Sequence, residues 1–246
     1  MKNKKEKQII GQLIYGVHPI VEMLKAKRRK LITLYTTKPE PKGFKEVKKF
    51  WPQYKVALQY VSRDVLSKMS FTTDHQGLVA WVKDFPLRKK PFNKDKQKFL
   101  VMLDSIQDPR NVGAILRSAY CAGVDGVVMT KKDSAKLNAT VFKSAAGLAE
   151  HLEIFVASSA QSAAQELKNA GYNLYLAAFG GKKATGCDFK QPCCIVIGNE
   201  GVGISKSIYK YGQQVTLPQK TNDISYNASV AAGILLFLAG TLHKRI

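Results

Sequence analysis

The second half of the chain holds a series of continuous apolar runs, and this feature constrains the fold more than any other. The runs are FLVMLD (99–104), GVVM (126–129), EIFVA (153–157), NLYLAAF (173–179) and CCIVIG (193–198). Strands that are apolar at every position are buried on both faces, as in parallel sheets. The intervening residues predict helices around 111–122, 139–148 and 159–170. The pattern predicts a mostly parallel sheet with helices on both sides, with a ligand site at the carboxyl ends of its strands.

The first hundred residues predict a smaller domain made of short alternating elements. Helices are expected at 18–28, 41–51 and 63–69, and Ser62 is expected to cap the last of them. Strands are expected at 31–37, 54–61 and 77–82. This alternation indicates a small α/β domain.

A segment without apolar periodicity separates the two halves. It reads FPLRKKPFNKDKQK (85–98), and its two prolines and many basic residues are typical of a linker. The expected organisation is a basic tail (1–9), a first domain (10–83), a basic linker (84–98) and a second domain (99–246).

Positive charge is concentrated in the first domain, tail and linker. Lys and Arg number 39 against 18 Asp and Glu, which gives a formal net charge of +21. Residues 1–100 hold 24 basic and 8 acidic residues (+16), whereas residues 101–246 hold 15 and 10 (+5). A basic half favours a polyanion such as nucleic acid, or an anionic membrane surface. The most apolar stretch, Ala228 to Leu242, is shorter than a bilayer requires and predicts a buried helix.

Several familiar chemical signatures are absent from the sequence. It has no P-loop GxxxxGK[ST], no GxGxxG after the first strand of the second domain, no HExxH and no GxSxG. The four cysteines form no CxxC pair and have no His partner at zinc spacing. We therefore expect no metal site, reduced thiols and a soluble cytoplasmic protein.

Three strand ends of the second domain carry unusual polar residues instead. The segments are DSIQDPRNVGAILR (104–117), CCIVIGNEGVGIS (193–205) and VTLPQKTNDISYNASVAAGILLFLAG (215–240). Each closes a predicted strand with a turn rich in glycine, asparagine or other polar residues. Because these turns close the same ends of one sheet, they predict a single site.

Individual residues of these segments suggest particular interactions. Asn111 is suited to cap the helix that follows the first strand, and Arg117 stands within an apolar stretch of that helix. Glu200 lies in the glycine-rich turn, where its carboxylate could pair with Arg117. Ser225 and Asn227 are both suited to open the strongly apolar last helix.

Taken together, the three segments resemble the SpoU/TrmH family of RNA ribose 2′-O-methyltransferases, within the SPOUT superfamily. DPRNVGAILRSAYCAGVDGVVM (108–129) is similar to motif 1, IGNEGVGIS (197–205) to motif 2 and LPQKTNDISYNASVAAGILLF (217–237) to motif 3. YGVHPIVEMLK (15–25) and HQGLVAWV (75–82) resemble the small substrate-binding domain of the family. Within this family, the sequence resembles the bacterial 23S rRNA guanosine-2′-O-methyltransferases.

The resemblance implies a fold, a cofactor and partners. It implies a C-terminal trefoil knot that binds S-adenosyl-L-methionine, a homodimer formed by the C-terminal domain with active sites at the interface, and an RNA substrate. The expected substrate is 23S rRNA or the assembling large ribosomal subunit. The same chemistry on tRNA, and a catalytically inactive RNA-binding relative, are the alternatives.

The resemblance also assigns roles to particular positions. The catalytic positions are Asn111, Arg117, Glu200, Ser225 and Asn227. The cofactor-contacting positions are Ala178, Ile197, Gly198, Leu217 and Tyr226. Motif 3 departs from the family pattern, because Thr221 stands where a glycine is usual and Tyr226 replaces a leucine.

The expected reaction is methyl transfer to a ribose 2′-hydroxyl, and the family makes Arg117 the activator. A guanidinium has a pKa above about 12 and rarely gives up its proton. Two roles are therefore open for Arg117: a base, deprotonated near the bound cationic sulfonium, or a charged group that stabilises the alkoxide and grips phosphate. Glu200 is expected to orient Arg117 in either case.

Overall fold

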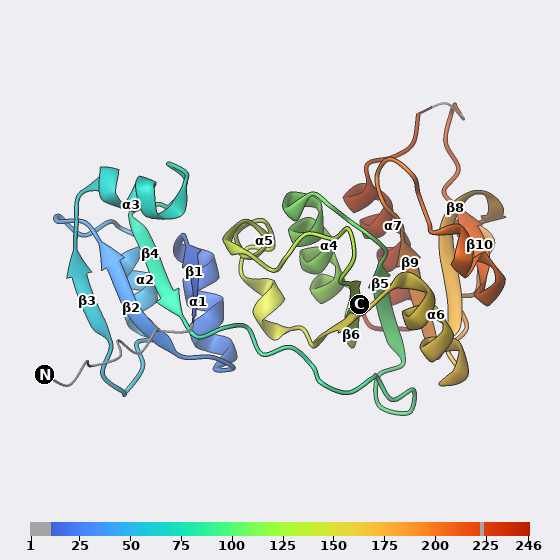
Figure 1. Cartoon of the computed structure of the whole chain (residues 1–246), viewed down its shortest axis with the longest axis horizontal. Coiled ribbons are helices and arrows are strands. Elements are labelled where there is room, and N and C mark those ends of the chain that lie inside the picture. Colours follow the sequence, from blue (N-terminus) through green and yellow to red (C-terminus); the bar gives the residue numbers. More distant parts are fainter. Residues whose placement is uncertain (1–10, 222–223) are drawn as a thin grey trace, which may run out of the picture. The chain divides into compact units, whose positions relative to one another are not determined.

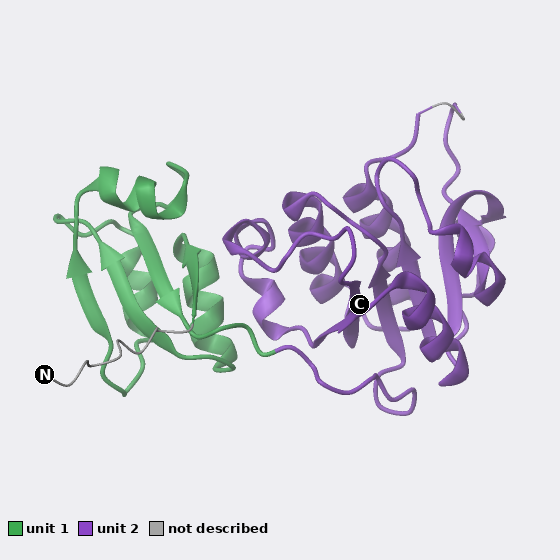
Figure 2. Cartoon of the chain, viewed as in Figure 1, with its two compact units in different colours: residues 1–86 green, residues 87–246 purple. Residues whose placement is uncertain are grey.

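A computed structural model of the chain describes residues 11–221 and 224–246 (Figure 1). The chain forms two compact units, Met1–Pro86 (unit 1) and Leu87–Ile246 (unit 2), which are coloured separately in Figure 2. The boundary between the units falls within the segment predicted as a linker. The predicted basic tail at 1–9 lies outside the described residues.

Unit 1 is a four-stranded sheet with three helices. The strands are β1 (Gln12–Tyr15), β2 (Leu31–Thr36), β3 (Ala57–Tyr60) and β4 (Leu78–Val82), and the helices are α1 (Val17–Ala26), α2 (Phe44–Lys49) and α3 (Arg63–Ser70). The strand order is β1-β4-β2-β3; β2 and β3 are parallel, and β4 is antiparallel to β1 and β2. The expected α/β alternation is confirmed, and Ser62 caps α3 by accepting a hydrogen bond from the Val65 N–H at 3.3 Å.

Strand β1 is an element that the sequence analysis did not predict. Its four residues, QLIY, are too few to show a periodicity of two. Its existence depends on its partner, because every residue of β1 pairs with a residue of β4 along an antiparallel ladder. Sheet pairing between segments more than sixty residues apart therefore decides the structure here.

Unit 2 is built on a six-stranded sheet of order β10-β8-β9-β5-β6-β7, in which every neighbouring pair is parallel. The strands are β5 (Phe99–Leu103), β6 (Gly126–Thr130), β7 (Ile154–Ala157), β8 (Asn173–Lys183), β9 (Cys193–Ile197) and β10 (Gly212–Thr216). The helices are α4 (Pro109–Cys121), α5 (Ala139–Ser144), α6 (Ala160–Asn169) and α7 (Ala228–Leu242), with 3₁₀ turns η1 (Leu148–His151), η2 (Ala184–Gly186) and η3 (Lys206–Tyr211). The parallel sheet predicted from the apolar runs is confirmed.

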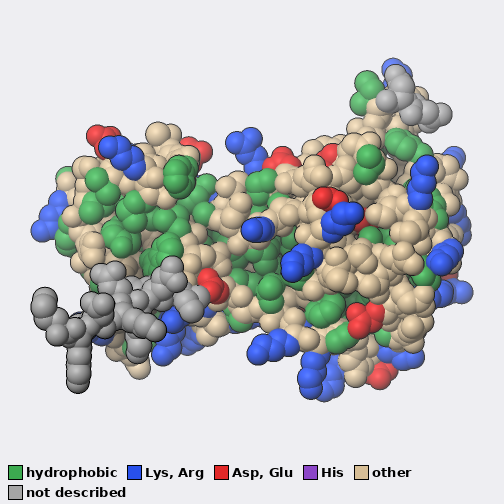
Figure 3. Space-filling view, viewed as in Figure 1, with side chains coloured by type: hydrophobic (Ala, Val, Ile, Leu, Met, Phe, Trp, Pro, Cys, Tyr) green, Lys and Arg blue, Asp and Glu red, His purple; other side chains and the backbone are tan. Residues whose placement is uncertain are grey.

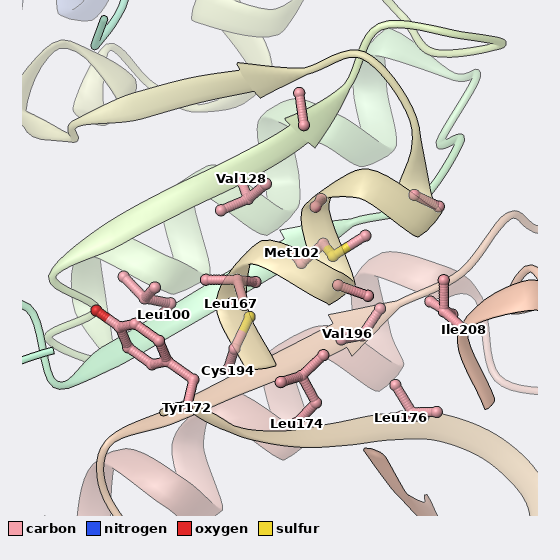
Figure 4. Close-up of a cluster of buried hydrophobic side chains, with 14 of the residues drawn as sticks. Leu100, Met102, Val128, Leu167, Tyr172, Leu174, Leu176, Cys194, Val196 and Ile208 are labelled. Carbon is pink, nitrogen blue, oxygen red and sulfur yellow. The ribbon is translucent and has the colours of Figure 1, made fainter. Parts of the chain in front are cut away.

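Both faces of this sheet are covered by helices. Figure 4 shows one face, where Leu100, Val128 and Val196 pack against Leu167 of α6 and Ile208 of η3. Because neighbouring side chains of a strand point to opposite faces, Phe99 points to the other one. There its ring meets that of His243, directly after α7, with centroids 5.0 Å apart. The strands are thus apolar at consecutive positions because each face has its own helical layer.

The cysteines of unit 2 are packing residues. Cys187, Cys193 and Cys194 are buried, Cys121 is exposed, and all four are free thiols. Burial raises the pKa of Cys193 to about 12 and raises the pKa of Cys194 well above its ordinary value. The thiols of Cys193 and Cys194 therefore stay protonated at neutral pH.

Residues 87–98, expected to be a linker, are packed onto unit 2. The Arg88 N–H donates to the Ile154 carbonyl at 2.8 Å, and its guanidinium pairs with Glu153. The guanidinium also lies 4.7 Å from the centre of the Phe92 ring. Phe92 is 5% exposed and belongs to the core cluster; a side chain at Gly126 would meet its ring at 2.2 Å. Composition alone did not show this packing because a single buried ring anchors a segment that is otherwise polar.

In the described part of the chain, no helix combines the length and apolar character that crossing a membrane requires.

The packing of Phe92 gives a stability prediction. Phe92→Ala should lower the free energy of unfolding of unit 2 by about 3 kcal/mol, because it removes a buried ring and leaves a cavity. Both tryptophans, Trp51 and Trp81, lie in unit 1. In urea, circular dichroism should therefore show an earlier transition for unit 2, while the tryptophan fluorescence transition stays unchanged.

Phe71→Ala is the matched control, because Phe71 is 95% exposed and its loss should cost less than about 0.5 kcal/mol. Equal effects of the two substitutions would show that residues 87–98 are not part of the unit 2 core.

Candidate functional site

A cavity of about 450 Å³ opens at the carboxyl ends of β8, β9 and β10, the edge that the sequence analysis predicted. Residues 177–179, 197–204 and 215–217 provide most of its wall, and Gln219, residues 225–228 and the first turns of α7 complete it. All five positions expected to contact a cofactor line this cavity: Ala178, Ile197, Gly198, Leu217 and Tyr226.

The cavity wall is mainly apolar, with one charged side chain. Ile197, Val215 and Leu235 give it apolar surface. Among the described lining residues, Glu200 is the only one that is charged at neutral pH. This wall suits a ligand that has a flat apolar part and a positive charge, since both would find a complementary surface.

A closed glycine-rich loop forms one lip of the cavity. Asn199 and Gly203 exchange two main-chain hydrogen bonds of 3.0 and 2.9 Å. The Asn199 side chain accepts from the N–H groups of Gly201 and Val202 at 2.8 and 3.1 Å, and donates to the Ser105 carbonyl at 2.8 Å. Gly198 permits this closure, because a Cβ there would lie 2.3 Å from the carbonyl carbon of Gly203.

Asn199 is a structural residue of the site that the sequence analysis did not identify. The signal available was its place between two glycines in IGNEG, where a side-chain amide commonly replaces main-chain partners in a turn. Gln219 was also missed. It lines the cavity, and its side chain donates to the Ile224 carbonyl at 2.8 Å, which holds together the loop before α7.

The glycine-rich loop is tied to the central strand by a buried carboxylate. Asp104 follows β5 and is fully buried. It accepts hydrogen bonds from the Ser205 N–H at 2.8 Å, the Ser205 hydroxyl at 3.0 Å and the Ser105 hydroxyl at 3.1 Å. A buried carboxylate needs such donors, because burial without them is strongly unfavourable.

Three of the predicted catalytic residues form one hydrogen-bond network. The Asn111 side-chain NH₂ group donates to the Glu200 carboxylate at 2.7 Å. The Asn227 side-chain NH₂ group donates to the side-chain oxygen of Asn111 at 3.2 Å. The side-chain oxygen of Asn227 accepts hydrogen bonds from the N–H and the hydroxyl of Ser229 at 2.8 and 2.6 Å. The network joins α4, the glycine-rich loop and the start of α7, so it brings together segments that are far apart in the sequence.

The expected role of Asn111 as a helix cap is wrong. Helix α4 begins at Pro109, and Asp108 caps it by accepting from the Arg110 N–H at 2.8 Å. Asn111 is therefore already helical, and its side chain is available to the network. Asn227 does cap α7, and Ser225 lines the cavity outside the network.

Arg117 lies apart from the other predicted catalytic residues. It is exposed on α4 and does not line the cavity. The expected pairing with Glu200 is not present, and the Arg117 side chain forms no ion pair or hydrogen bond with the described residues. Helix geometry explains the separation, because six residues rotate a side chain by about 240° from Asn111. Arg117 therefore points away from its own chain's cavity.

Residues 11–221 and 224–246 contain no cluster of three or more His, Cys, Asp or Glu side chains arranged to hold a metal ion.

Comparison with known proteins shows which protein families the chain matches. Residues 98–237 match the SpoU rRNA Methylase family, and residues 13–87 match the family described as RNA 2′-O ribose methyltransferase substrate binding. YacO of Bacillus subtilis, named for the TrmH tRNA/rRNA methyltransferase family, is 31% identical over 91% of this chain and 93% of its own. The 23S rRNA (guanosine-2′-O-)-methyltransferase RlmB of Shewanella oneidensis is 31% identical over 92% of this chain and 96% of its own.

A solved structure agrees with the fold. The SpoU methyltransferase AviRb from Streptomyces viridochromogenes, in complex with the cofactor AdoMet, superposes with a TM-score of 0.79 at 22% sequence identity. The match covers 100% of this chain and 95% of that chain.

The lip of the cavity gives a second prediction. Gly198→Ala should lower the free energy of unfolding of unit 2 by about 2 kcal/mol, because the added methyl group collides with main-chain atoms of Gly203. Amide hydrogen exchange of residues 199–203 should become faster. Gly201→Ala is the control in the same loop, since its added Cβ would meet only the Asn199 side chain at 3.5 Å. If the two substitutions behave alike, close approach at Gly198 does not hold the loop.

Proposed function

This chain belongs to the SpoU rRNA methylase family, and from this membership we propose that its target is the ribose 2′-hydroxyl of a guanosine in 23S rRNA. Its family and its relatives make it an S-adenosylmethionine-dependent RNA methyltransferase. The similarity to RlmB extends over both units, at 92% of the chain, and this supports ribosomal RNA as the substrate. We keep the cytoplasm as the predicted location and the trefoil knot as a predicted feature of unit 2.

The observation that carries the proposal is the cavity with its adjoining network. Five positions implicated in cofactor contact line one space of about 450 Å³, and the Asn111–Glu200–Asn227 network stands beside it. That volume lies within the range of roughly 300–1,000 Å³ typical of small-molecule sites. When bound, S-adenosylmethionine supplies a methyl group on a positively charged sulfur. Glu200, the one carboxylate among the described lining residues, suits that charge, and Leu235 and Val215 suit an adenine ring.

We propose that Arg117 completes the site of the partner subunit in a homodimer. Its side chain is exposed and is not paired with Glu200, which hydrogen-bonds Asn111 instead. Because no carboxylate among the described residues pairs with it, the guanidinium can reach the RNA bound by a second copy. As a charged fork it would grip a phosphate and stabilise the 2′-oxygen as that oxygen loses its proton to solvent. Asn111, Ser225 and Asn227 would orient the ribose.

An apolar stripe on α7 supports this dimer. Val230, Ile234 and Phe237 are 49%, 37% and 59% exposed, and their spacing of four and three residues places them on one helix face. Helix α4, which carries Arg117, packs against α7, and a Cβ at Gly233 would lie 3.5 Å from the Ser118 hydroxyl. A second copy that covered this stripe would lie beside Arg117.

The experiment that tests the function is methyl transfer to purified RNA. The protein is incubated with labelled S-adenosylmethionine and with 23S rRNA, 16S rRNA or tRNA from a strain that lacks its gene. Labelling of one guanosine of 23S rRNA, with a phosphodiester bond that becomes resistant to alkali, is expected. Labelling of tRNA alone would support the alternative substrate, and no labelling of any RNA would support an inactive RNA-binding relative.

Arg117 gives a prediction that also tests the shared site. Arg117→Ala and Arg117→Lys should each abolish transfer, because a point charge cannot replace the planar fork. Affinity for S-adenosylmethionine, measured by calorimetry, should stay unchanged, since Arg117 does not line the cavity. Arg110→Lys, the same change at an exposed arginine of the same helix, is the control.

Mixing two inactive variants separates a shared site from a site within one chain. Arg117→Ala and Asn227→Ala should regain transfer when mixed and allowed to exchange subunits, because each mixed dimer holds one intact pair. If the mixture stays inactive while mixed dimers form, Arg117 acts within its own chain.

The apolar stripe gives a prediction on assembly. The wild-type protein should sediment as a dimer at micromolar concentration. Phe237→Glu should produce a monomer, because a charge within the stripe would be buried without a partner. Phe71→Glu, which changes an exposed phenylalanine of unit 1, should leave the dimer intact. An active wild-type monomer would disprove both the dimer and the shared site.

A further inference from the structure

One end of unit 1 is formed by three basic or aromatic segments: the turn 25–30, the loop 50–55 and the exit segment 83–86. We name this surface the basic end. The Leu31 N–H, directly after the turn, donates to the Tyr54 hydroxyl at 2.8 Å. The Lys83 N–H donates to the Lys30 carbonyl at 2.9 Å, and the Arg29 guanidinium donates to the Lys83 carbonyl at 3.2 Å. These bonds join the three segments into one surface.

The basic end carries a dense excess of positive charge. Five of the six residues in KAKRRK (25–30) are Lys or Arg. Lys27, Lys30 and Lys55 are exposed, and none of them forms an ion pair with a described residue. The nearby carboxylates are Glu22, which pairs with Lys25 at 2.8 Å, and the exposed Asp84. Three ammonium groups are therefore available to an external anion.

Two partly exposed rings accompany these cations. Phe50 is 39% exposed, and the Lys25 ammonium lies 5.1 Å from its ring centre. Tyr54 is 38% exposed, and the Lys30 ammonium lies 5.5 Å from its ring centre. Figure 3 shows Lys and Arg at the margins of the visible face of unit 1, with hydrophobic side chains between them. Cations beside exposed rings suit single-stranded RNA, because phosphates meet the charges and unstacked bases meet the rings.

The opposite end of unit 1, where β2 ends and β4 begins, differs in its charge. There Glu40 accepts from the Lys48 ammonium at 2.7 Å and from the Tyr60 hydroxyl at 2.8 Å, and both bonds lower the pKa of its carboxyl. Asp64 and Asp74 are exposed and add negative charge. Lys42 and Lys68 are also exposed at this end, so positive and negative side chains are mixed there.

We infer that the basic end is the surface of unit 1 that holds the substrate RNA, with Lys27, Lys30 and Lys55 on phosphates and Tyr54 under an unpaired base. This inference rests on the proposed function, which supplies RNA as the ligand. The choice of this end is supported by the fact that the chain leaves unit 1 there and continues into unit 2. Phe85, stacked under the Arg28 and Arg29 guanidinium groups at 5.2 and 5.7 Å, directly precedes the segment that continues into the methyltransferase unit.

The test compares two variants that remove equal charge from opposite ends. Lys27→Gln with Lys30→Gln changes the basic end, and Lys42→Gln with Lys68→Gln changes the other end. Affinity for a 23S rRNA transcript is measured by filter binding across a series of salt concentrations. The first variant should bind about tenfold more weakly at low salt, and its slope of log affinity against log salt should be shallower by about two units. The second variant should match the wild type.

The Tyr54 ring is tested separately. Tyr54→Leu should weaken RNA binding at least about fivefold at every salt concentration, because a stacking surface is lost without a change of charge. Tyr54→Phe keeps the ring and should bind like the wild type, although it loses the hydrogen bond to Leu31. Circular dichroism confirms that both variants fold.

The inference and the proposed function fail in different ways. Equal weakening by the two lysine pairs, or no change in slope for Lys27→Gln with Lys30→Gln, would overturn the inference whether or not the wild type methylates RNA. Vesicles containing phosphatidylserine are a further probe. If the first variant loses vesicle binding while RNA binding is unchanged, the surface serves a membrane and the inference is wrong. Absence of methyl transfer by a wild type that still shows the expected binding pattern would contradict the proposed function alone.

Discussion

Asp104 is fully buried at the end of the central strand β5, and its carboxylate accepts three hydrogen bonds from two serines. Ser105 lies in the loop that leads to α4, and Ser205 lies beyond the glycine-rich loop that follows β9. One buried side chain therefore joins the loop that leads to α4 to the end of the glycine-rich loop that lines the cavity. It does so with neutral donors, so the site gains rigidity without an additional cation near the ligand. The Asn199 amide, which donates to the Ser105 carbonyl at 2.8 Å, reinforces the same junction.

The parallel sheet makes this junction possible. Strands β5 and β9 are neighbours and run in the same direction, so both deliver their polar loops to one edge. The approach of Gly198 to Gly203 closes the loop after β9, and the network of Asn111, Glu200 and Asn227 adds α4 and α7 to it. Apart from the local closure at Gly198, the site thus depends on contacts between segments that are distant in the sequence. Stability and site geometry are consequently set by the same few polar contacts.

Features of the structure that depend on local sequence could be predicted from the sequence, whereas features that depend on distant contacts could not. Apolar runs such as FLVMLD and CCIVIG correctly predicted β5 and β9, because burial on both faces leaves a local signature. The positions expected to contact the cofactor do line one cavity, since they follow strands of that sheet. Strand β1 and the packing of Phe92 were missed, because each depends on a partner far along the chain. The expected pairing of Arg117 with Glu200 was also wrong, because Glu200 hydrogen-bonds Asn111, which is more than eighty residues away in the sequence.

The distribution of charge between the units follows from the two tasks of such an enzyme. RNA affinity needs many cations, and it is strongest where phosphates displace counterions. A cofactor with a positive sulfur would be repelled by those same cations at short range, because the attraction or repulsion of charges grows as the surroundings become less polar. The cavity is lined by one carboxylate among the described residues, and positive charge is denser on unit 1 (18 basic and 7 acidic residues, +11 over 86 residues) than on unit 2 (21 and 11, +10 over 160 residues). The proposed phosphate-binding surface lies on unit 1 and the cavity lies in unit 2, so one chain can meet both requirements. In the proposed function both units act on one RNA, and the segment 87–98, which connects them, is anchored to unit 2 through Phe92 and Arg88.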